Sequence, residues 1–235
     1  MSNKNIRIIA FDADDTLWAT EDYFRAAERK FSKIFQKNGT HEELMKKHFD
    51  TILQNMPIYG FGIKAFTLSS IEAALKITDY TLTPIQTEKI LNIGKEMLTA
   101  KVEVLKGVRE TLHELHGSYK LVVLTKGDLL DQQRKLNESG LRSYFEHIEV
   151  MSDKKTTDYQ ALFRLFNIKP EEFMMVGNSL KSDVIPIVEL GACGVHIPYH
   201  TTWEYEQLDL KELDKHQYHN LTHISELPDL LKSLQ

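Results

Sequence analysis

The stretch IRIIAFDADDT, residues 6–16, decides the fold. Its first part, Ile6–Phe11, is short, apolar and rich in β-branched side chains, which predicts a buried β-strand. The acidic residues Asp12, Asp14 and Asp15 follow directly. In an open parallel sheet, ligands bind at the carboxyl ends of the strands. The stretch therefore predicts a functional site as well as a strand.

Similar strand-like runs recur only in the second half of the chain. They are Leu121–Leu124, Ile148–Met151, Phe173–Val176 and Gly194–Ile197, with a weaker one at Leu221–Ile224. Apolar residues at helical spacing lie between them, at Val108, Leu112 and Leu115 and at Tyr159, Leu162, Phe163 and Phe166. Strands that alternate with helices predict an α/β fold, a Rossmann-like parallel sheet with helices on both faces.

The segment 19–100 contains no convincing strand. Its apolar residues recur at helical spacing, for example at Phe24, Ala27 and Phe31, and Pro84 suits the start of a helix. An all-helical insertion straight after the first strand predicts a separate cap domain. We therefore expect a discontinuous Rossmann-like core, residues 1–18 and 101–235, and a helical cap, residues 19–100.

The composition narrows the class of protein. The chain has 235 residues, of which 42% are hydrophobic, enough for a proper core. Its net charge of -5 gives no indication of a nucleic-acid partner or of an acidic membrane surface. The first residues lack the long apolar region of a signal peptide, and one cysteine excludes an internal disulfide framework. We expect a cytoplasmic protein that binds neither nucleic acid nor membranes, and its oligomeric state is not predicted.

Three carboxylates behind a buried strand repel one another. At an effective dielectric constant near 20 and a separation of 4 Å, each pair costs on the order of 4 kcal/mol. A bound cation relieves this repulsion, and oxygen ligands suit a hard ion such as Mg²⁺. The alternative is an acidic turn in which Asp14 or Asp15 simply caps a helix.

Polar residues follow the next three strands as well. A hydroxyl at Thr125, beside exposed backbone amides, suits a phosphate cradle, although the same turn could be an ordinary helix cap. A lysine at Lys154 or Lys155 could neutralise a phosphoryl group or form a solvated surface pair. Gly177 allows a tight turn, and Asp183 could return a carboxylate to the cation or cap the helix that follows.

The order of these residues resembles the four motifs of the haloacid dehalogenase superfamily. Asp12–Thr16 is similar to its Asp-x-Asp-x-Thr motif, Thr125 to its hydroxyl motif, and Lys154–Lys155 contains its lysine. Gly177–Asp183 is similar to the acidic fourth motif, usually Gly-Asp-x-x-x-x-Asp. Asn178 stands where an aspartate is common, and its uncharged amide would weaken metal binding. The position of the helical insertion also fits the superfamily's first-type caps.

The resemblance implies a covalent mechanism. Asp12 would attack phosphorus and form an aspartyl-phosphate, and Asp14 would act as general acid and then as general base. Thr16 would support the turn of Asp14, with Asn178 as a second supporting residue. The cap would close over the site to exclude water.

The resemblance also implies the ligands of the substrate and of the metal. Mg²⁺ would be bound by the side chains of Asp12 and Asp183 and by the backbone carbonyl of Asp14. Thr125 and the lysine would bind the phosphoryl oxygens.

For the lysine we choose Lys154 over Lys155. The next helix is expected to begin near Thr157, because Thr157 and Gln160 have capping-box spacing. Both lysines then lie in the loop before it, and helical geometry cannot separate them. When the family's usual motif spacing is counted backward from Gly177, the choice of Lys155 requires a shorter loop between the lysine and Gly177 than the choice of Lys154 does. The spacing therefore favours Lys154.

The resulting hypothesis is a Mg²⁺-dependent phosphomonoester hydrolase that acts on a small phosphorylated metabolite. A phosphomutase on the same scaffold is the alternative, since it shares all four motifs. A metal-independent dehalogenase needs no second carboxylate, and Asp14 argues against it. A non-catalytic binding protein would be expected to have lost Asp12 or Asp14. In the cap, Tyr59–Lys64 either lines the entrance to the site or is a simple helix–helix loop.

Other chemically suggestive residues receive structural interpretations. His41 and His48 do not have the spacing of a metal motif, and the charges around them indicate a solvated helix face. The scattered histidines are interpreted as surface residues: His196, His200, His216, His219 and His223. Cys193 has small neighbours before a strand and is expected in the core.

Overall fold

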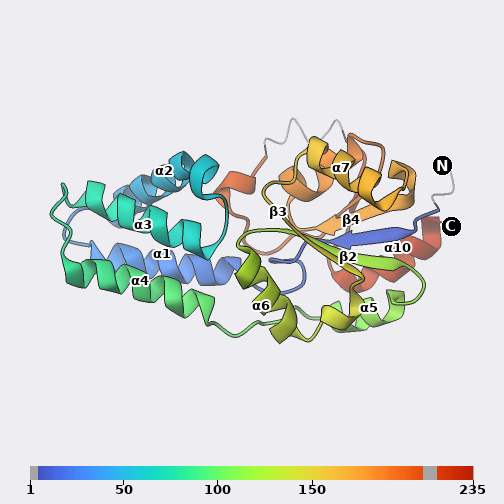
Figure 1. Cartoon of the computed structure of the whole chain (residues 1–235), viewed down its shortest axis with the longest axis horizontal. Helices are drawn as coiled ribbons and strands as arrows, with labels where there is room; N and C mark the ends of the chain where they lie inside the picture. The colour runs from blue at the N-terminus through green and yellow to red at the C-terminus, as the bar shows by residue number, and fades with distance from the viewer. Residues whose placement is uncertain (1–4, 209–215, 235) are drawn as a thin grey trace. The chain divides into compact units, whose positions relative to one another are not determined.

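The computed structural model describes residues 5–208 and 216–234. The chain divides into two compact units, which can be followed along the chain in Figure 1. The sheet unit comprises Met1–Glu21, Val102–Thr125 and Arg134–Gln235, and the helical unit comprises Asp22–Lys101 and Lys126–Gln133. Residues 1–4, on which the signal-peptide expectation rests in part, lie outside the described residues.

The sheet unit contains a six-stranded sheet with the strand order β3-β2-β1-β4-β5-β6. Its strands are β1 (Ile8–Phe11), β2 (Lys120–Lys126), β3 (His147–Met151), β4 (Phe173–Gly177), β5 (Cys193–His196) and β6 (His219–Asn220). The strand β1 pairs in parallel with both β2 and β4, and the pairs β4–β5 and β5–β6 are also parallel. The direction of the connections reverses between β1 and β4, where a doubly wound sheet forms its binding crevice.

Both faces of the sheet are buried. Ile9 and Phe11 of β1 pack into one cluster with α5 (Val108–Leu115) and α10 (Leu227–Leu234), whereas Ile8 and Ala10 pack into another with α7 (Thr156–Phe166). Figure 1 shows α7 on one face of the sheet and α5 and α10 on the other. Because both faces are covered, the central strands β1 and β4 carry continuous apolar runs. The expectation of a Rossmann-like α/β fold is confirmed.

The helices alternate with the strands in the second half of the chain. The α-helices are α1 (Glu21–Ile34), α2 (His41–Tyr59), α3 (Ile63–Ile77), α4 (Pro84–Leu98), α5 (Val108–Leu115), α6 (Leu129–Ser139), α7 (Thr156–Phe166), α8 (Ile185–Val188) and α10 (Leu227–Leu234). Short helical segments are η1 (Arg142–Tyr144), η2 (Pro170–Glu172), η3 (Leu180–Val184), η4 (Glu204–Glu206) and η5 (Ile224–Glu226).

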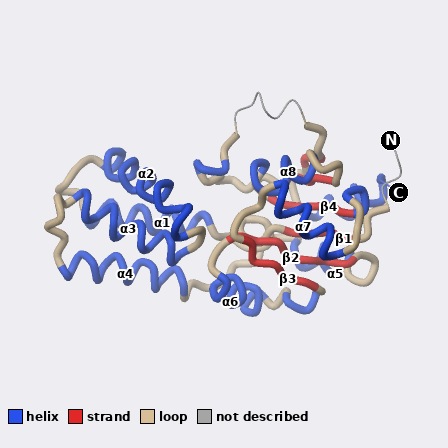
Figure 2. Tube along the Cα trace, turned by 45° about the horizontal axis from the view of Figure 1, so that its top comes forward, coloured by secondary structure: helices blue, strands red, loops and turns tan. Residues whose placement is uncertain are grey.

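Helices α1 to α4 make up most of the helical unit, and Figure 2 shows no strand among them. Phe31 of α1 and Phe35, which directly follows this helix, pack with residues of α2, α3 and α4 in one apolar cluster. Thr40 and Thr83 close capping boxes at the starts of α2 and α4, and α4 begins at Pro84 as expected. The sequence predicted this segment as residues 19–100; the unit also includes Lys126–Gln133, which the sequence did not indicate.

The segment Tyr59–Lys64 joins α2 to α3. Gly60 and Gly62 have φ angles of 71° and 101°, in the region that favours glycine. The Nζ atom of Lys126 lies 4.3 Å from the ring centroid of Phe61, and Lys64 forms a salt bridge of 3.0 Å with Asp128. The segment is therefore a helix–helix loop that packs on residues 126–128, within the helical unit.

The expectations for Leu221–Ile224 and for His48 are wrong. Leu221–Ile224 does not form a strand: the last strand is the two-residue β6, just before it, and Leu221 and Ile224 instead fill the core beside α5. His48 is not on a solvated face, because it is buried in the helical unit with its Nε2 atom 2.8 Å from Ser70 Oγ. Cys193 is buried in the core, as expected.

Among the described residues, no helix is both long and apolar enough to cross a membrane.

Candidate active site

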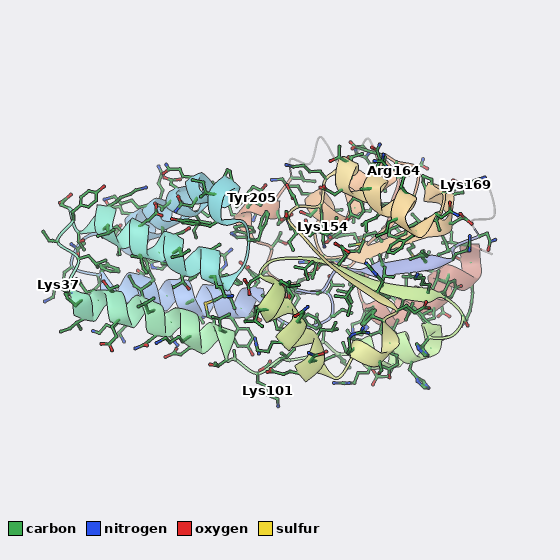
Figure 3. All side chains as sticks on the ribbon, in the orientation of Figure 1. Lys37, Lys101, Lys154, Arg164, Lys169 and Tyr205 are labelled. Carbon is green, nitrogen blue, oxygen red and sulfur yellow. The ribbon has the colours of Figure 1, made fainter. Side chains whose placement is uncertain are left out.

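The ends of the central strands bring the predicted site residues to one edge of the sheet unit. Asp12 follows β1, and its backbone amide donates to the carbonyl of Val176 in β4 at 2.9 Å. Thr125 lies at the end of β2 and is buried. Lys154, labelled in Figure 3, follows β3, and Asn178 follows β4. Asp12 and Asn178 therefore flank the point between β1 and β4 where the topology reverses.

Lys154 joins two buried carboxylates. Its Nζ atom donates to Asp12 Oδ1 and, at 2.7 Å, to Asp183 Oδ1. The side chains of Lys154 and Asp183 are each only 1% exposed. Two carboxylates and one ammonium group leave an excess of one negative charge within this buried cluster. An added cation would offset that charge.

The cluster shifts the protonation equilibria of its members. Burial raises the pKa of Asp12 to about 7, an effect that Lys154 opposes and Asp183 reinforces. Burial alone would lower the pKa of Lys154, but the charges of Asp12 and Asp183 outweigh it and raise that pKa. The ammonium form of Lys154 is thus strongly favoured beside the two carboxylates.

The carboxylates provide oxygen donors that fit Mg²⁺. This ion typically takes one or two carboxylates and completes its shell with waters and substrate phosphates. Within residues 5–208 and 216–234, no group of three or more His, Cys, Asp or Glu side chains is arranged to hold a metal. Asp12 and Asp183, with a backbone oxygen, match the smaller donor set that Mg²⁺ accepts.

Asp14 directs its side chain to a different set of donors. Its Oδ1 atom accepts from Trp18 Nε1 at 2.9 Å, from Thr20 Oγ1 at 2.7 Å and from Lys135 Nζ at 2.6 Å. Asp14 is 29% exposed, so it is partly accessible to solvent. This carboxylate is thus oriented independently of the Asp12–Lys154–Asp183 cluster.

Asp15 caps a helix, one of the alternatives that the sequence left open. Its Oδ1 atom accepts from the backbone amides of Thr20 at 2.8 Å and Glu21 at 3.1 Å, at the start of α1. Its φ angle is 60°, a conformation that aspartate tolerates better than most residues. The backbone amide of Asp15 donates to the carbonyl of Trp18 at 2.7 Å, which closes the turn.

Thr16 lies between Asp12 and Asn178. Its hydroxyl is 3.3 Å from Asp12 Oδ2 and 3.4 Å from Asn178 Oδ1. The hydroxyl therefore contacts the carboxylate of Asp12, whereas the expected support of the Asp14 turn is limited to its backbone amide, which donates to Ala13. The backbone oxygen of Asn178 accepts from His196 Nε2 at 3.1 Å, so His196 is half-buried beside the site rather than a surface residue.

The loop after β4 holds Asp183 tightly. Its Oδ2 atom accepts from the backbone amide of Ser179 at 3.0 Å, within the π-helical segment η3. A Cβ atom added at Gly177 would lie 2.2 Å from Asp183 Oδ2, so only glycine permits this approach. The capping role that the sequence allowed for Asp183 belongs to Ser179, whose hydroxyl accepts from the amide of Ser182 at 3.0 Å.

A carboxylate from the C-terminal part of the sheet unit supports the same loop. Glu206 Oε2 accepts from Ser179 Oγ at 2.5 Å and from Ser182 Oγ at 2.6 Å. The neighbouring Tyr205, labelled in Figure 3, offers its carbonyl to Lys181 Nζ at 2.7 Å. No motif marked Glu206 in the sequence, because the contact joins segments that are remote along the chain.

The two adjacent lysines have different environments. Lys155 is 73% exposed on its side chain and pairs with Asp153 at 3.1 Å, whereas Lys154 is buried. The helix α7 begins at Thr156, and the backbone amide of Lys155 donates to the side chain of Asp158 at 2.8 Å. The capping box expected at Thr157 is therefore wrong by two residues.

Sequence comparison identifies relatives across nearly the whole chain. It is 26% identical over 242 residues to the glyceraldehyde 3-phosphate phosphatase of Pyrococcus furiosus, covering 99% of this chain and 94% of the relative. It is 27% identical over 194 residues to a pyrimidine 5′-nucleotidase of Escherichia coli, covering 78% of this chain and 82% of that protein.

Comparison with solved structures also identifies a relative that covers the whole chain. A haloacid dehalogenase-like family hydrolase from Xanthomonas campestris superposes with a TM-score of 0.87 at 33% sequence identity, covering 100% of this chain and 94% of that one. The family pattern of haloacid dehalogenase-like hydrolases matches residues 6–191, which include every motif described above. The chain therefore belongs to the haloacid dehalogenase-like hydrolase family, and it is an enzyme of the hydrolase class.

Proposed function

We propose that the protein is a Mg²⁺-dependent phosphatase that hydrolyses a small phosphate monoester through an aspartyl-phosphate at Asp12. The observation that carries this proposal is the buried cluster of Asp12, Lys154 and Asp183, with Asp14 held separately two residues after Asp12. Such a site has a nucleophile, a fixed positive charge and a second carboxylate for proton transfer. The names of the relatives, which include a phosphatase and a nucleotidase, favour phosphate esters.

Asp12 is the proposed nucleophile. One carboxylate oxygen attacks phosphorus as the bond to the leaving oxygen breaks, which gives an acyl phosphate on Asp12. Thr16 donates toward Asp12 Oδ2 and Lys154 toward Oδ1, so both oxygens have defined partners before substrate binds. The carboxylate must be ionised to attack, and the ammonium group of Lys154 favours that form.

Asp14 is the proposed general acid and base. It gives a proton to the leaving oxygen and becomes a carboxylate. It then takes a proton from the water that attacks the acyl phosphate, which frees phosphate and restores Asp12. The donors around its Oδ1 atom hold the carboxylate in one orientation for both transfers.

The remaining residues bind the anion. Lys154 and the hydroxyl of Thr125 are the proposed contacts to the phosphoryl oxygens, while Asp183 and the backbone oxygen of Asp14 join Asp12 as the proposed metal ligands. Bound Mg²⁺ would offset the repulsion between a carboxylate nucleophile and a phosphate dianion. Asn178 keeps Thr16 in place and contributes no charge.

The helical unit is the proposed cap, which would exclude water during the reaction. The substrate is proposed only as a small phosphorylated metabolite. The names of the two relatives specify glyceraldehyde 3-phosphate and pyrimidine nucleotides, which share the phosphate ester. Glyceraldehyde 3-phosphate and pyrimidine mononucleotides are therefore the first substrates to assay.

The decisive experiment measures phosphate release from an aryl phosphate with Mg²⁺ and with EDTA. Wild-type protein should be active only with Mg²⁺, and Asp12→Asn should be inactive. Asp229→Asn is a matched control because Asp229 is 85% exposed and lies in the C-terminal helix α10. Quenched single turnovers with labelled substrate should yield an acid-stable, hydroxylamine-labile protein phosphate that Asp12→Asn lacks.

The same experiment addresses the alternatives. Product analysis that found an isomeric phosphate ester instead of free phosphate would favour a phosphomutase. Halide release from a haloacid in EDTA, without phosphatase activity in Mg²⁺, would favour a dehalogenase. Failure of the wild-type protein to hydrolyse any phosphate ester would overturn the proposal.

A further inference from the structure

Lys135 contacts the carboxylate of Asp14 although the two residues are far apart along the chain. It lies in α6, and its Nζ atom is 2.6 Å from Asp14 Oδ1. The Lys135 side chain is only 10% exposed, so most of its length is withdrawn from water. Such a short contact between an ammonium group and a carboxylate is a strong, charge-assisted hydrogen bond.

Two further donors to Asp14 Oδ1, Trp18 and Thr20, are neutral. Trp18 Nε1 approaches it at 2.9 Å and Thr20 Oγ1 at 2.7 Å. Because three donors converge on one oxygen, they fix the rotation of the carboxylate about its bond to Cβ. Of these donors, Lys135 supplies positive charge.

We propose that Lys135 is a positioning residue for Asp14. It holds the carboxylate in the orientation needed for proton transfer and stabilises the negative charge that forms when Asp14 has given its proton to the leaving oxygen. Lys135 keeps its own protons throughout: the proton moves from Asp14 to the leaving group and is later replaced from water. The inference rests on the proposed function of Asp14.

A neighbouring ion pair shows what a purely structural contact on this helix looks like. Arg134 pairs with Glu138 one turn later at 2.7 Å, and Glu138 is 49% exposed. Exposed pairs of this kind contribute little. Lys135, in contrast, gives up much of its hydration to reach a carboxylate that precedes it by 121 residues, and this loss of hydration is costly unless the charge is paired.

The test compares substrates whose leaving groups differ in their need for a proton. Phenyl phosphate has a poor leaving group that needs protonation, whereas 4-nitrophenyl phosphate releases a stable anion. In Lys135→Met, kcat/KM for phenyl phosphate should fall about tenfold or more while that for 4-nitrophenyl phosphate falls by less than about threefold. Lys135→Arg should restore much of the lost rate because it keeps the charge.

Arg134→Met is the matched control, since it removes a positive charge from the adjacent position of the same helix. It should leave both rates unchanged, and thermal unfolding should show that all variants are folded. Should Lys135→Met not fold, Lys135→Gln carries the same comparison.

Equal losses on both substrates, or unchanged rates on both, would overturn the role of Lys135 while leaving the phosphatase assignment intact. A wild-type enzyme without activity toward either ester would instead overturn the proposed function and the inference together.

Discussion

Gly177 and Asp183 approach so closely that a Cβ atom added to the glycine would lie 2.2 Å from Asp183 Oδ2. The contact is possible because Gly177 ends β4 and Asp183 turns back toward it within η3. A side chain at this position would displace one of the two carboxylates that Lys154 joins. The position of Asp183 in the site therefore depends on the absence of a side chain at Gly177.

Gly177→Ala is expected to lower both stability and activity. Relief of the overlap requires a shift of Asp183 or of the backbone, which should cost about 1–3 kcal/mol of unfolding free energy. Denaturant unfolding and steady-state kinetics measure the two effects. Gly39→Ala is the control, because the atom nearest to its added Cβ atom would belong to the flexible side chain of Glu43, at 3.2 Å. Unchanged stability and rate in Gly177→Ala would contradict the geometry.

Lys154→Met should reduce kcat/KM on the order of 100-fold, the usual loss when a donor to a developing negative charge is removed. The variant also leaves Asp12 and Asp183 without the ammonium group between them. Lys155→Met should stay within about threefold of the wild type, since Lys155 forms an exposed pair with Asp153. Steady-state kinetics of the two variants decide the assignment, and the reverse order would move the phosphate-binding role to Lys155.

Removal of divalent metal with EDTA should abolish activity, and Mg²⁺ should restore it. Ca²⁺ should restore it poorly because its larger, looser coordination shell would misplace the nucleophile. Asp183→Asn should raise the half-saturating Mg²⁺ concentration about tenfold or more, since even the loss of a residue that only supports a metal ligand typically costs about 10- to 100-fold in affinity. A titration of Mg²⁺ by calorimetry checks this without turnover. Full activity in EDTA would favour the dehalogenase alternative.

His48 should make the stability of the protein depend on pH. Burial lowers the pKa of His48 to about 4 from the usual 6.5, so the unfolded state binds more protons between these values. Stability contributed by the neutral histidine is complete above about pH 6.5 and is lost as the pH falls toward 4. The loss over this window should be roughly 1–3 kcal/mol.

The comparison of wild-type protein with His48→Gln isolates this contribution, because other titrating groups are common to both. The difference in unfolding free energy should change between pH 7 and pH 4.5. His113→Gln, at an exposed position of α5, is the control. A difference that stays constant with pH would show that His48 does not carry the effect.

The sequence predicted the sheet because buried parallel strands carry continuous apolar runs, as in Ile8–Phe11 and Phe173–Gly177. It also predicted which residues end each strand, since the carboxyl edge of such a sheet collects them. Asp12, Lys154 and Asp183, each singled out from the sequence, lie in mutual contact through the ammonium group of Lys154.

Contacts between remote segments could not be predicted in this way. The pair Lys135–Asp14 joins positions 121 residues apart, and neither periodicity nor motif spacing relates them. Glu206 reaches Ser179 from beyond β5 for the same reason. The strand β6 was misplaced because two residues are too few for an alternating pattern to appear.

The single cysteine has a practical consequence for measurement. Cys193 begins β5, is 1% exposed, and is the only thiol in the sequence. A thiol reagent can therefore react only when the edge of the core opens, and its rate reports how often that happens. The reaction rate of Cys193 thus measures local opening of the sheet without an added label. It can be measured in every variant proposed above.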